Sequence, residues 1–279
     1  MPGQGHGEGA LESRELGAPR GGRSSGTVDE DRPGGVYGVI SCTRLMVATS
    51  LVASPVVAPL LLAVDFDGTI TLRDTLHVIV DEHGRRGVWD ELEPDLVAGR
   101  ITIEEAMAEQ FRTVTAGPDA IAALVRERAG VREGFRDFVR FAEDGGHRLV
   151  VMSAGFRSVI GLMLADMGLD HLEVVSNEAI FSEDGCTLVF SDDRGEVCDL
   201  CDRRCKRHAM RVRHRGEPVI YVGDGISDRC VSGVADLVFA RAGLADWLDE
   251  RERPYIPFND FHDVINGVRA FEAGERAVA

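Results

Sequence analysis

The sequence predicts an α/β fold in which a doubly wound parallel sheet forms the core and an all-helical cap is inserted into it. Three apolar segments have the composition of buried strands, and each ends in small, polar or acidic residues: PLLLAVDF (59–66), HRLVVMSAG (147–155) and EPVIYVGDG (217–225). Helical patterns follow the second and third of them at 155–168 and 228–236, and such alternation is typical of doubly wound sheets. Because these sheets bind ligands at the carboxyl ends of their strands, we expect the three polar ends to line one crevice.

The N-terminal extension, residues 1–58, is predicted to be disordered, because its first 45 residues are rich in Gly, Arg, Ser and Glu without periodicity. The uncharged segment 46–64 has the composition of a signal or membrane segment. However, Pro55 and Pro59 interrupt it, and its last third must form the first strand. We therefore expect no membrane or export role, and Met46 is an alternative start of translation.

A helical cap is predicted at residues 75–135. The interval between the first two strands is roughly 70 residues, too long for a simple crossover, and its apolar residues recur at helical spacing. Residues 59–74 and 136–279 are left to form the core, and a hairpin is expected within 173–190, around Asp184.

The composition suits a globular protein of one or two domains, because 44% of the 279 residues are hydrophobic and 28% are charged. The formal net charge is -16 and no basic patch offsets it, so nucleic acid is not an expected partner. Six cysteines in a chain of this length are more typical of a reduced, cytoplasmic protein than of a secreted disulfide framework. The oligomeric state is left open.

The acidic strand ends predict a metal-assisted reaction at phosphate. Asp65 and Asp224 follow different strands and supply two carboxylates of the kind that bind Mg²⁺, and Asp228 offers a third. A carboxylate can also attack a phosphoryl group, and Asp67 lies close enough to Asp65 to protonate the leaving oxygen and then activate water. The hydroxyl of Ser153 and the ammonium of Lys206 would stabilise the transferring phosphoryl group.

Four motifs carry a resemblance to a known family. DFDGTIT (65–71), VVMSAG (150–155), Lys206 within CDRRCKRH, and YVGDGISD (221–228) resemble, in order and spacing, the motifs of the haloacid dehalogenase superfamily of phosphohydrolases. The resemblance runs from about residue 60 to the C-terminus. It implies a Rossmann-like core with a helical cap, Mg²⁺ as cofactor and a phosphatase activity on a small phosphorylated metabolite.

The same resemblance implies a role for each matching residue. Asp65 would be the nucleophile and Asp67 the general acid and base. The side chains of Asp65 and Asp224, with the backbone carbonyl of Asp67, would hold Mg²⁺, and Asp228 would support the metal. The residues that would order the loop and the phosphate are Thr69, Ser153 and Lys206.

The resemblance indicates a branch of the family and does not identify one metabolite. The chain looks like the branch that contains phosphoserine phosphatase and the methionine-salvage phosphatases. Where phosphoserine phosphatase carries a glutamate for the substrate amine and an arginine for the carboxylate, this chain has Asp74 and Gln110. Gln cannot replace a bidentate Arg, so the methionine-salvage type is favoured. Phosphoserine, or another phosphorylated amine or sugar, is the alternative. Asp74 could equally cap the first cap helix, and Gln110 could be an ordinary helix-face residue.

Two further hypotheses remain open. A non-catalytic module that senses phosphate or Mg²⁺ would use the same crevice, but it would be favoured only by loss of a motif residue, and none is lost. The segment CDLCDRRCKRH has spacings compatible with zinc at Cys198, Cys201, Cys205 and His208. Structural zinc sites usually join two ligand pairs across a longer loop, so reduced thiols are the expectation.

Redox regulation is the second possibility for these cysteines. Cys205 lies beside Lys206, which would favour its thiolate and make oxidation a brake on activity. Cys42, Cys186 and Cys230 are isolated in the sequence and have no predicted role.

Overall fold

The computed structural model describes residues 58–190, 197–201 and 205–274. The predicted disordered extension lies outside the described residues apart from residue 58, and so do Cys42 and Met46. In the part of the chain that is described, no helix has both the length and the apolar character needed to cross a bilayer.

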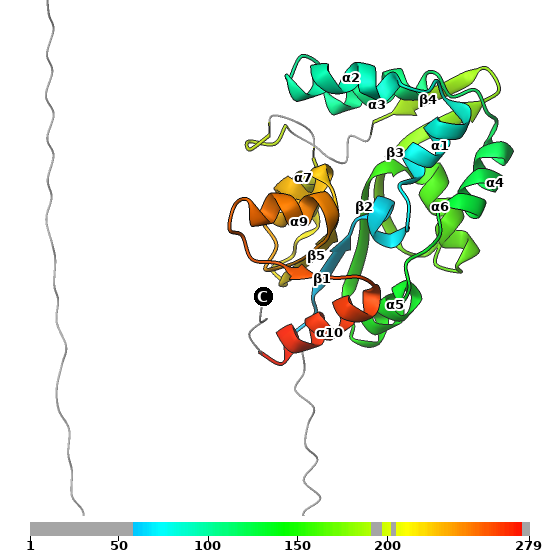
Figure 1. Ribbon diagram of the computed structural model, residues 1–279. Helices are drawn as coiled ribbons and strands as arrows, with labels where there is room; N and C mark the ends of the chain where they lie inside the picture. The colour runs from blue at the N-terminus through cyan, green and yellow to red at the C-terminus, as the bar shows by residue number, and fades with distance from the viewer. Residues whose placement is uncertain (1–57, 191–196, 202–204, 275–279) are drawn as a thin grey trace, which may run out of the picture. The chain divides into compact units, whose positions relative to one another are not determined.

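Within the described residues, seven strands form one sheet in the order β4-β3-β2-β1-β5-β6-β7 (Figure 1). Neighbouring strands are parallel except for β3 and β4, which are antiparallel. The strands are β1 (Leu61–Val64), β2 (Arg148–Phe156), β3 (Glu173–Ser182), β4 (Gly185–Val189), β5 (Val219–Gly223), β6 (Leu237–Ala240) and β7 (Ile256–Pro257). The predicted α/β fold with a largely parallel sheet is confirmed.

The helices follow the alternation that the sequence predicts. Two short turns, η1 (Phe66–Ile70) and η3 (Ile226–Asp228), follow β1 and β5. The helices are α1 (Thr75–His83), α2 (Val88–Val97), α3 (Ile103–Phe111), α4 (Pro118–Arg128), α5 (Phe135–Asp144), α6 (Arg157–Asp166), α7 (Lys206–Arg213), α8 (Arg229–Ser232), α9 (Ala242–Asp249) and α10 (Phe261–Glu272).

Strand β1 lies at the centre of the sheet, and its position determines which loops meet. It is parallel to β2 on one side and to β5 on the other, with Val64 in register with Val151 and Val222. Because the three strands run in the same direction in this register, the residues that follow them leave the sheet side by side. The three polar strand ends therefore meet at one edge, as predicted.

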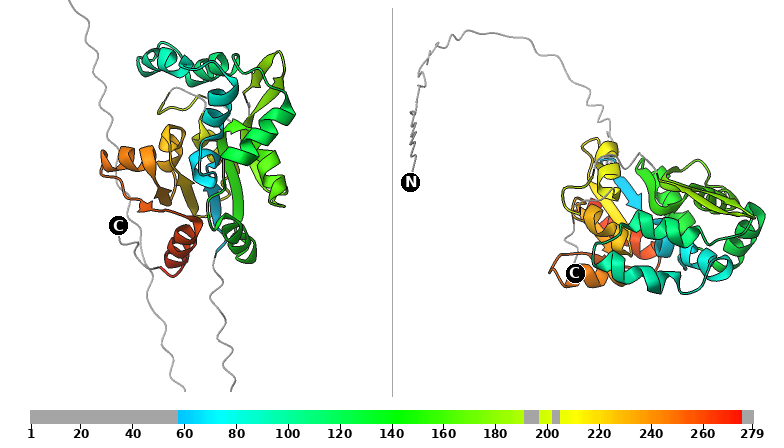
Figure 2. Two further views of the ribbon diagram at one scale, coloured as in Figure 1. Left: turned by 45° about the vertical axis from the view of Figure 1, so that its right-hand side comes forward. Right: turned by 90° about the horizontal axis from the view of Figure 1, so that it is seen from above.

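Alternate residues of β1 enter two apolar clusters on opposite faces of the sheet. Leu62 and Val64 pack with residues of α5, α6 and α10, whereas Leu61 and Ala63 pack with residues of α7. All four are fully buried, and each buried Leu or Val contributes about 1.5–3 kcal/mol. Figure 2 shows α10, in red, beside α5, in green, which it contacts.

Helices α1 to α4 occupy the segment in which we predict the cap. Asp74 caps α1, Thr102 caps α3, and Pro118 is the first residue of α4. Helix α1 packs on α4, and α2 packs on α3, which also contacts β4. The rings of Phe111 in α3 and Phe156 in β2 meet edge to face with centroids 4.7 Å apart, so the apolar core continues into these helices. That they form a separate cap domain at 75–135 stays a prediction.

The chain enters the inserted helices through residues 71–73 and leaves them through residues 129–132. The two segments lie side by side. The amide of Arg73 donates to the carbonyl oxygen of Ala129 at 3.1 Å, and a single antiparallel bridge connects the segments. Entry and exit are therefore at one place on the sheet.

The hairpin predicted around Asp184 is confirmed as β3 and β4. Ser182 pairs with Gly185, so the turn contains only Glu183 and Asp184. The carboxylate of Glu183 accepts a hydrogen bond from the amide of Gly117 at 3.1 Å. This bond ties the hairpin to the start of α4.

Candidate active site

The loop after β1 is a tight turn that requires a glycine. Gly68 has φ +76°, in the left-handed region, and its amide donates to Oγ1 of Thr71 at 3.0 Å. The same hydroxyl donates to the carbonyl oxygen of Phe66 at 3.2 Å. A Cβ atom at position 68 would lie 2.3 Å from Oδ2 of Asp224, so the turn can approach that carboxylate only with glycine.

Lys206 lies between two carboxylates at the centre of the site. Its Nζ is 2.5 Å from Oδ1 of Asp65 and 2.6 Å from Oδ1 of Asp228. The three residues are 3%, 4% and 0% exposed, so the charges are almost completely removed from water. Such burial is strongly unfavourable for an unpaired charge, and the ion pairs compensate for it.

The pKa values of the two carboxylates that share Lys206 are shifted in opposite directions. Burial raises the pKa of Asp65 well above its usual range, and the charge of Asp228 adds to the effect. Burial also acts to raise the pKa of Asp228, but Lys206 and other donors outweigh it, and the pKa is lowered. Asp228 is therefore the ionised partner of Lys206, whose own pKa is raised by the two carboxylates in spite of its burial.

Both carboxylate oxygens of Asp228 accept hydrogen bonds. Its Oδ1 accepts a hydrogen bond from the hydroxyl of Tyr221 at 2.5 Å, and its Oδ2 accepts from the amides of Asp224 and Gly225, each at 3.0 Å. Sequence reasoning missed Tyr221. A signal was present, because a tyrosine inside a buried strand needs a partner for its hydroxyl.

The carboxylate of Asp67 forms its hydrogen bonds with residues other than Lys206 and Asp228. Its Oδ1 accepts from the amide and the hydroxyl of Thr75, at 3.0 and 2.5 Å, and its Oδ2 accepts from Oγ of Ser153 at 3.1 Å. Burial, followed by the nearby charge of Asp74, raises the pKa of Asp67 to about 6 in spite of these hydrogen bonds. The Ser153 hydroxyl also accepts from the amide of Gly155 at 2.8 Å. Asp67 can therefore hold or release a proton near neutral pH.

The described residues include a group of three carboxylates that could hold a cation. One oxygen from each of Asp65, Asp224 and Asp228 lies within 4.8 Å of the others. Oδ1 of Asp224 accepts from Thr69 Oγ1 at 3.0 Å, and burial, together with the charge of Asp228, raises the pKa of Asp224 to about 6. A bound cation favours the ionised form of all three carboxylates, and with Lys206 as the balancing charge they then carry an excess of two negative charges. This excess and the all-oxygen donor set fit Mg²⁺.

A buried arginine supports the turn from the side of the inserted helices. Arg132 donates to the carbonyl oxygens of Thr69 at 2.7 Å, Gly68 at 2.8 Å and Asn259 at 3.0 Å. It fixes the backbone of the loop that carries Asp65 and Asp67. No sequence signal identified it, because its partners are backbone carbonyls that any residue type could supply.

The two predicted substrate residues are placed apart from the carboxylate group. Asp74 caps α1, and its carboxylate accepts from the amides of Leu76 at 2.8 Å and His77 at 3.1 Å. Gln110 lies on α3 and is buried, at 6% exposed. Asp74 still lies near enough to Asp67 to raise its pKa. The structure gives neither residue a contact with Asp65, Asp224 or Asp228 among the described hydrogen bonds.

The cysteine segment differs from the sequence expectation in two respects. Sulfur atoms of Cys198, Cys201 and Cys205 do come together, but their fourth neighbour is Cys230, which is isolated only in the sequence, and His208 is not in the group. The predicted thiolate at Cys205 is also wrong. Burial raises the pKa of that thiol to about 12, because it is removed from water and the ammonium of Lys206 is committed to Asp65 and Asp228.

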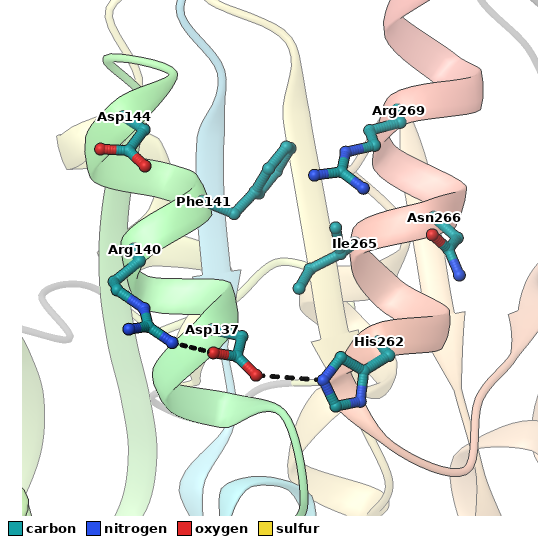
Figure 3. Close-up of a pocket in the computed structure, with 8 residues that line it drawn as sticks. All are labelled: Asp137, Arg140, Phe141, Asp144, His262, Ile265, Asn266 and Arg269. Carbon is teal, nitrogen blue, oxygen red and sulfur yellow. Dashed lines mark hydrogen bonds and ion pairs between the residues drawn. The ribbon is translucent and has the colours of Figure 1, made fainter.

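A hollow between α5 and α10 does not belong to this site (Figure 3). Its charged groups largely neutralise one another, since Asp137 pairs with both Arg140 and His262. The lining residues are Asp137, Arg140, Phe141, Asp144, His262, Ile265, Asn266 and Arg269. None of them is a residue of the carboxylate group.

Comparison with known proteins supports the family resemblance. Residues 62–232 match the family described as haloacid dehalogenase-like hydrolase. The chain is 31% identical over 212 residues to the 2-hydroxy-3-keto-5-methylthiopentenyl-1-phosphate phosphatase of Brevibacillus brevis, covering 74% of this chain and 93% of that protein. The protein of the same name from Geobacillus thermodenitrificans is 30% identical over 215 residues, covering 76% of this chain and 97% of that protein.

Solved structures share the fold at lower sequence identity. Phosphoserine phosphatase from T. onnurineus has a TM-score of 0.53 and 19% identity, covering 78% of this chain and 98% of that one. A phospho-aspartyl intermediate analogue of phosphoserine phosphatase has a TM-score of 0.58 and 19% identity, covering 74% of this chain and 97% of that one. At this identity the likeness concerns the fold alone.

Proposed function

Because this chain belongs to the haloacid dehalogenase-like hydrolase family, we propose that its buried carboxylates and Lys206 hydrolyse the phosphate ester of a small metabolite. The family match and the phosphatases it resembles make it a phosphoric monoester hydrolase. The observation that carries the proposal is that Asp65 and Asp228, which follow the neighbouring parallel strands β1 and β5, converge on Lys206 at the start of α7.

Asp65 is the proposed nucleophile. A bond forms between its carboxylate oxygen and phosphorus while the bond from phosphorus to the ester oxygen breaks, which leaves an aspartyl phosphate. Lys206, 2.5 Å from this carboxylate, places positive charge where negative charge develops on the transferring phosphoryl group. Asp228 holds the ammonium in position.

Asp67 is the proposed proton donor and acceptor. With a pKa raised to about 6, it can give a proton to the leaving oxygen in the first step. In the second step it takes a proton from the water that attacks phosphorus, which breaks the bond to Asp65 and releases phosphate. Thr75 and Ser153 hold both of its oxygens in place for these transfers.

Mg²⁺ is the proposed cofactor, on the fit of charge and donor set described above. Asp65, Asp224 and the backbone carbonyl of Asp67 would hold it. Both oxygens of Asp228 are already engaged by Lys206, Tyr221 and two amides, which favours a supporting role over direct ligation. When bound, Mg²⁺ supplies positive charge against the phosphate oxygens and the three carboxylates.

The proposed substrate is the one named in the curated relatives, 2-hydroxy-3-keto-5-methylthiopentenyl-1-phosphate. Two features support it over phosphoserine. The carboxylate of Asp74, at the position matched to the amine-binding glutamate, is engaged in capping α1. Gln110, at the position matched to the arginine, is uncharged and cannot form the bidentate ion pair that a substrate carboxylate requires. Phosphoserine, or another phosphorylated amine or sugar, is the alternative.

We also propose a cytoplasmic location, because the chain's six cysteines suit a reducing compartment. Cell fractionation, with the protein followed by an antibody, tests this.

The test of the function is phosphate release from a panel of phosphorylated metabolites, with Mg²⁺ and with a chelator, for the wild type and Asp65→Asn. We expect release to need Mg²⁺ and to fall at least a thousandfold in the variant, since the nucleophile is lost. Asp170→Asn, an exposed carboxylate outside the site, is the matched control and should retain full activity. If no compound is hydrolysed while the wild type still binds phosphate or Mg²⁺, the sensing module replaces the enzyme.

A further inference from the structure

Four cysteines from two parts of the chain meet beside the proposed active centre. Cys198 and Cys201 lie in the segment before α7, Cys205 is the residue that precedes α7, and Cys230 lies in α8. Their sulfur atoms all lie within 4.8 Å of one another. Cys198 is buried and the other three are partly buried, so the group is largely shielded from solvent.

The sulfur positions fit a tetrahedral metal site. With Zn–S bonds of 2.3 Å, the sulfur atoms of a regular tetrahedron are about 3.8 Å apart. All the sulfur atoms lie within 4.8 Å of one another, so they are close enough together to bind one ion. Contacts already exist across the group, since Cys198 interacts with Cys205 and Cys201 interacts with Cys230.

The sequence spacing also suits a structural site once Cys230 is included. Cys198 and Cys201 form a C-x2-C pair, which is a common arrangement of the first two zinc ligands. Cys230 comes from a distant part of the chain, so the ligands span a long loop and do not all come from one short segment.

A charged hydrogen-bond donor lies beside the sulfur atoms. Nη1 of Arg207 donates to the sulfur of Cys198 at 3.6 Å. Donors of this kind stabilise metal-bound thiolates and offset the negative charge that a four-thiolate site retains.

We propose that Cys198, Cys201, Cys205 and Cys230 bind one structural Zn²⁺. Thiolate sulfur is a soft ligand and four of them in tetrahedral arrangement select zinc over the hard cations that carboxylates prefer. The ion joins the segment that begins with Lys206 to the helix that follows Asp228, and so holds together the two partners of the buried ion pair. Zinc here is a positioning element, and its presence does not depend on the proposed reaction.

The experiment measures metal in the full-length protein, purified with a reductant and without added metal, by elemental mass spectrometry. We expect about one zinc per chain in the wild type and less than a tenth of that in Cys230→Ser. Cys186→Ser is the matched control, because Cys186 lies on β4 and outside the group, and it should retain the zinc. Exchange with Co²⁺ should give the visible absorption of a tetrahedral thiolate site.

Other results overturn the proposal. Wild-type protein without zinc that also fails to acquire Co²⁺ absorption excludes the site, and this holds even if Cys230→Ser does not fold. Zinc that is unchanged in folded Cys230→Ser and in Cys201→Ser places the metal elsewhere. Iron with inorganic sulfide identifies a cluster in place of zinc. An unreduced mass four hydrogens lower than the reduced mass identifies two disulfides.

Discussion

The carboxyl end of the sheet and the inserted helices α1–α4 use their polar side chains in different ways. At the sheet edge, Asp65, Lys206 and Asp228 are buried and paired with one another, at a large cost in desolvation that only geometry offsets. In the inserted helices, Asp74 caps a helix at a half-exposed position. The two carboxylates are thus placed by the loops that follow β1 and β5, and Lys206 by the start of α7, whereas Asp74 is placed by local helix structure.

The largest loss of stability is expected when Lys206 is replaced. In Lys206→Met, Asp65 and Asp228 remain buried without a cation, so we expect a loss of about 3–5 kcal/mol in the free energy of unfolding. Urea denaturation measures it. Arg213→Met on the same helix removes a half-exposed pair with Glu173 and should cost at most about 1 kcal/mol. Equal losses in the two variants would contradict the role given to the buried ion pair.

The protonation of Asp67 should make the stability of the protein depend on pH. Its folded pKa, about 6, is above the unfolded value of 3.8, so its stabilising contribution is present below pH 4 and is lost as the pH rises through 6. Asn cannot ionise. Asp67→Asn should therefore match the wild type near pH 4 and exceed its stability above pH 7 by on the order of 2 kcal/mol, while turnover falls about 10²- to 10⁴-fold.

Metal-free protein in denaturant titrations at several pH values checks this prediction. Asp170→Asn, whose carboxylate is exposed, should show no such pH-dependent gain over the wild type. A stability difference for Asp67→Asn that is the same at pH 4 and pH 8 would show that Asp67 is not held in a raised-pKa environment.

The smallest effect is expected at Asp74. Removing its capping carboxylate in Asp74→Ala should cost about 1 kcal/mol of stability and change KM less than tenfold. Thr102→Ala removes the cap of α3 and is the matched control for stability. A KM increase well above tenfold in Asp74→Ala alone would show that Asp74 contacts the substrate. Its role would then not be limited to capping α1.

The sequence alone predicts where a residue lies when a single local pattern determines its place in the fold. An apolar run that ends in DFDGT places Asp65 at the end of a buried strand whatever the rest of the chain does, and the parallel register then brings Asp224 beside it. The hairpin at Asp184 is local in the same sense.

Positions that depend on distant packing could not be predicted. Arg132 recognises backbone carbonyls across more than sixty residues of chain, and no residue type marks those acceptors. Cys230 joins the other cysteines only because α8 packs against α7. Whether Gln110 faces a substrate depends on the rotation of α3 about its axis, which helical periodicity in one sequence leaves undetermined.

The neighbouring crossings at residues 71–73 and 129–132 also bear on how such a protein can change its specificity. A segment whose two ends lie together can be lengthened, shortened or exchanged for another without moving the strands to which it is attached. In this respect the inserted helices can be exchanged while the strands of the core sheet stay in place. Exchange at these two points would leave the strands and the carboxylates that follow them in place, and it would require the incoming segment to supply a replacement for Thr75, which holds Asp67.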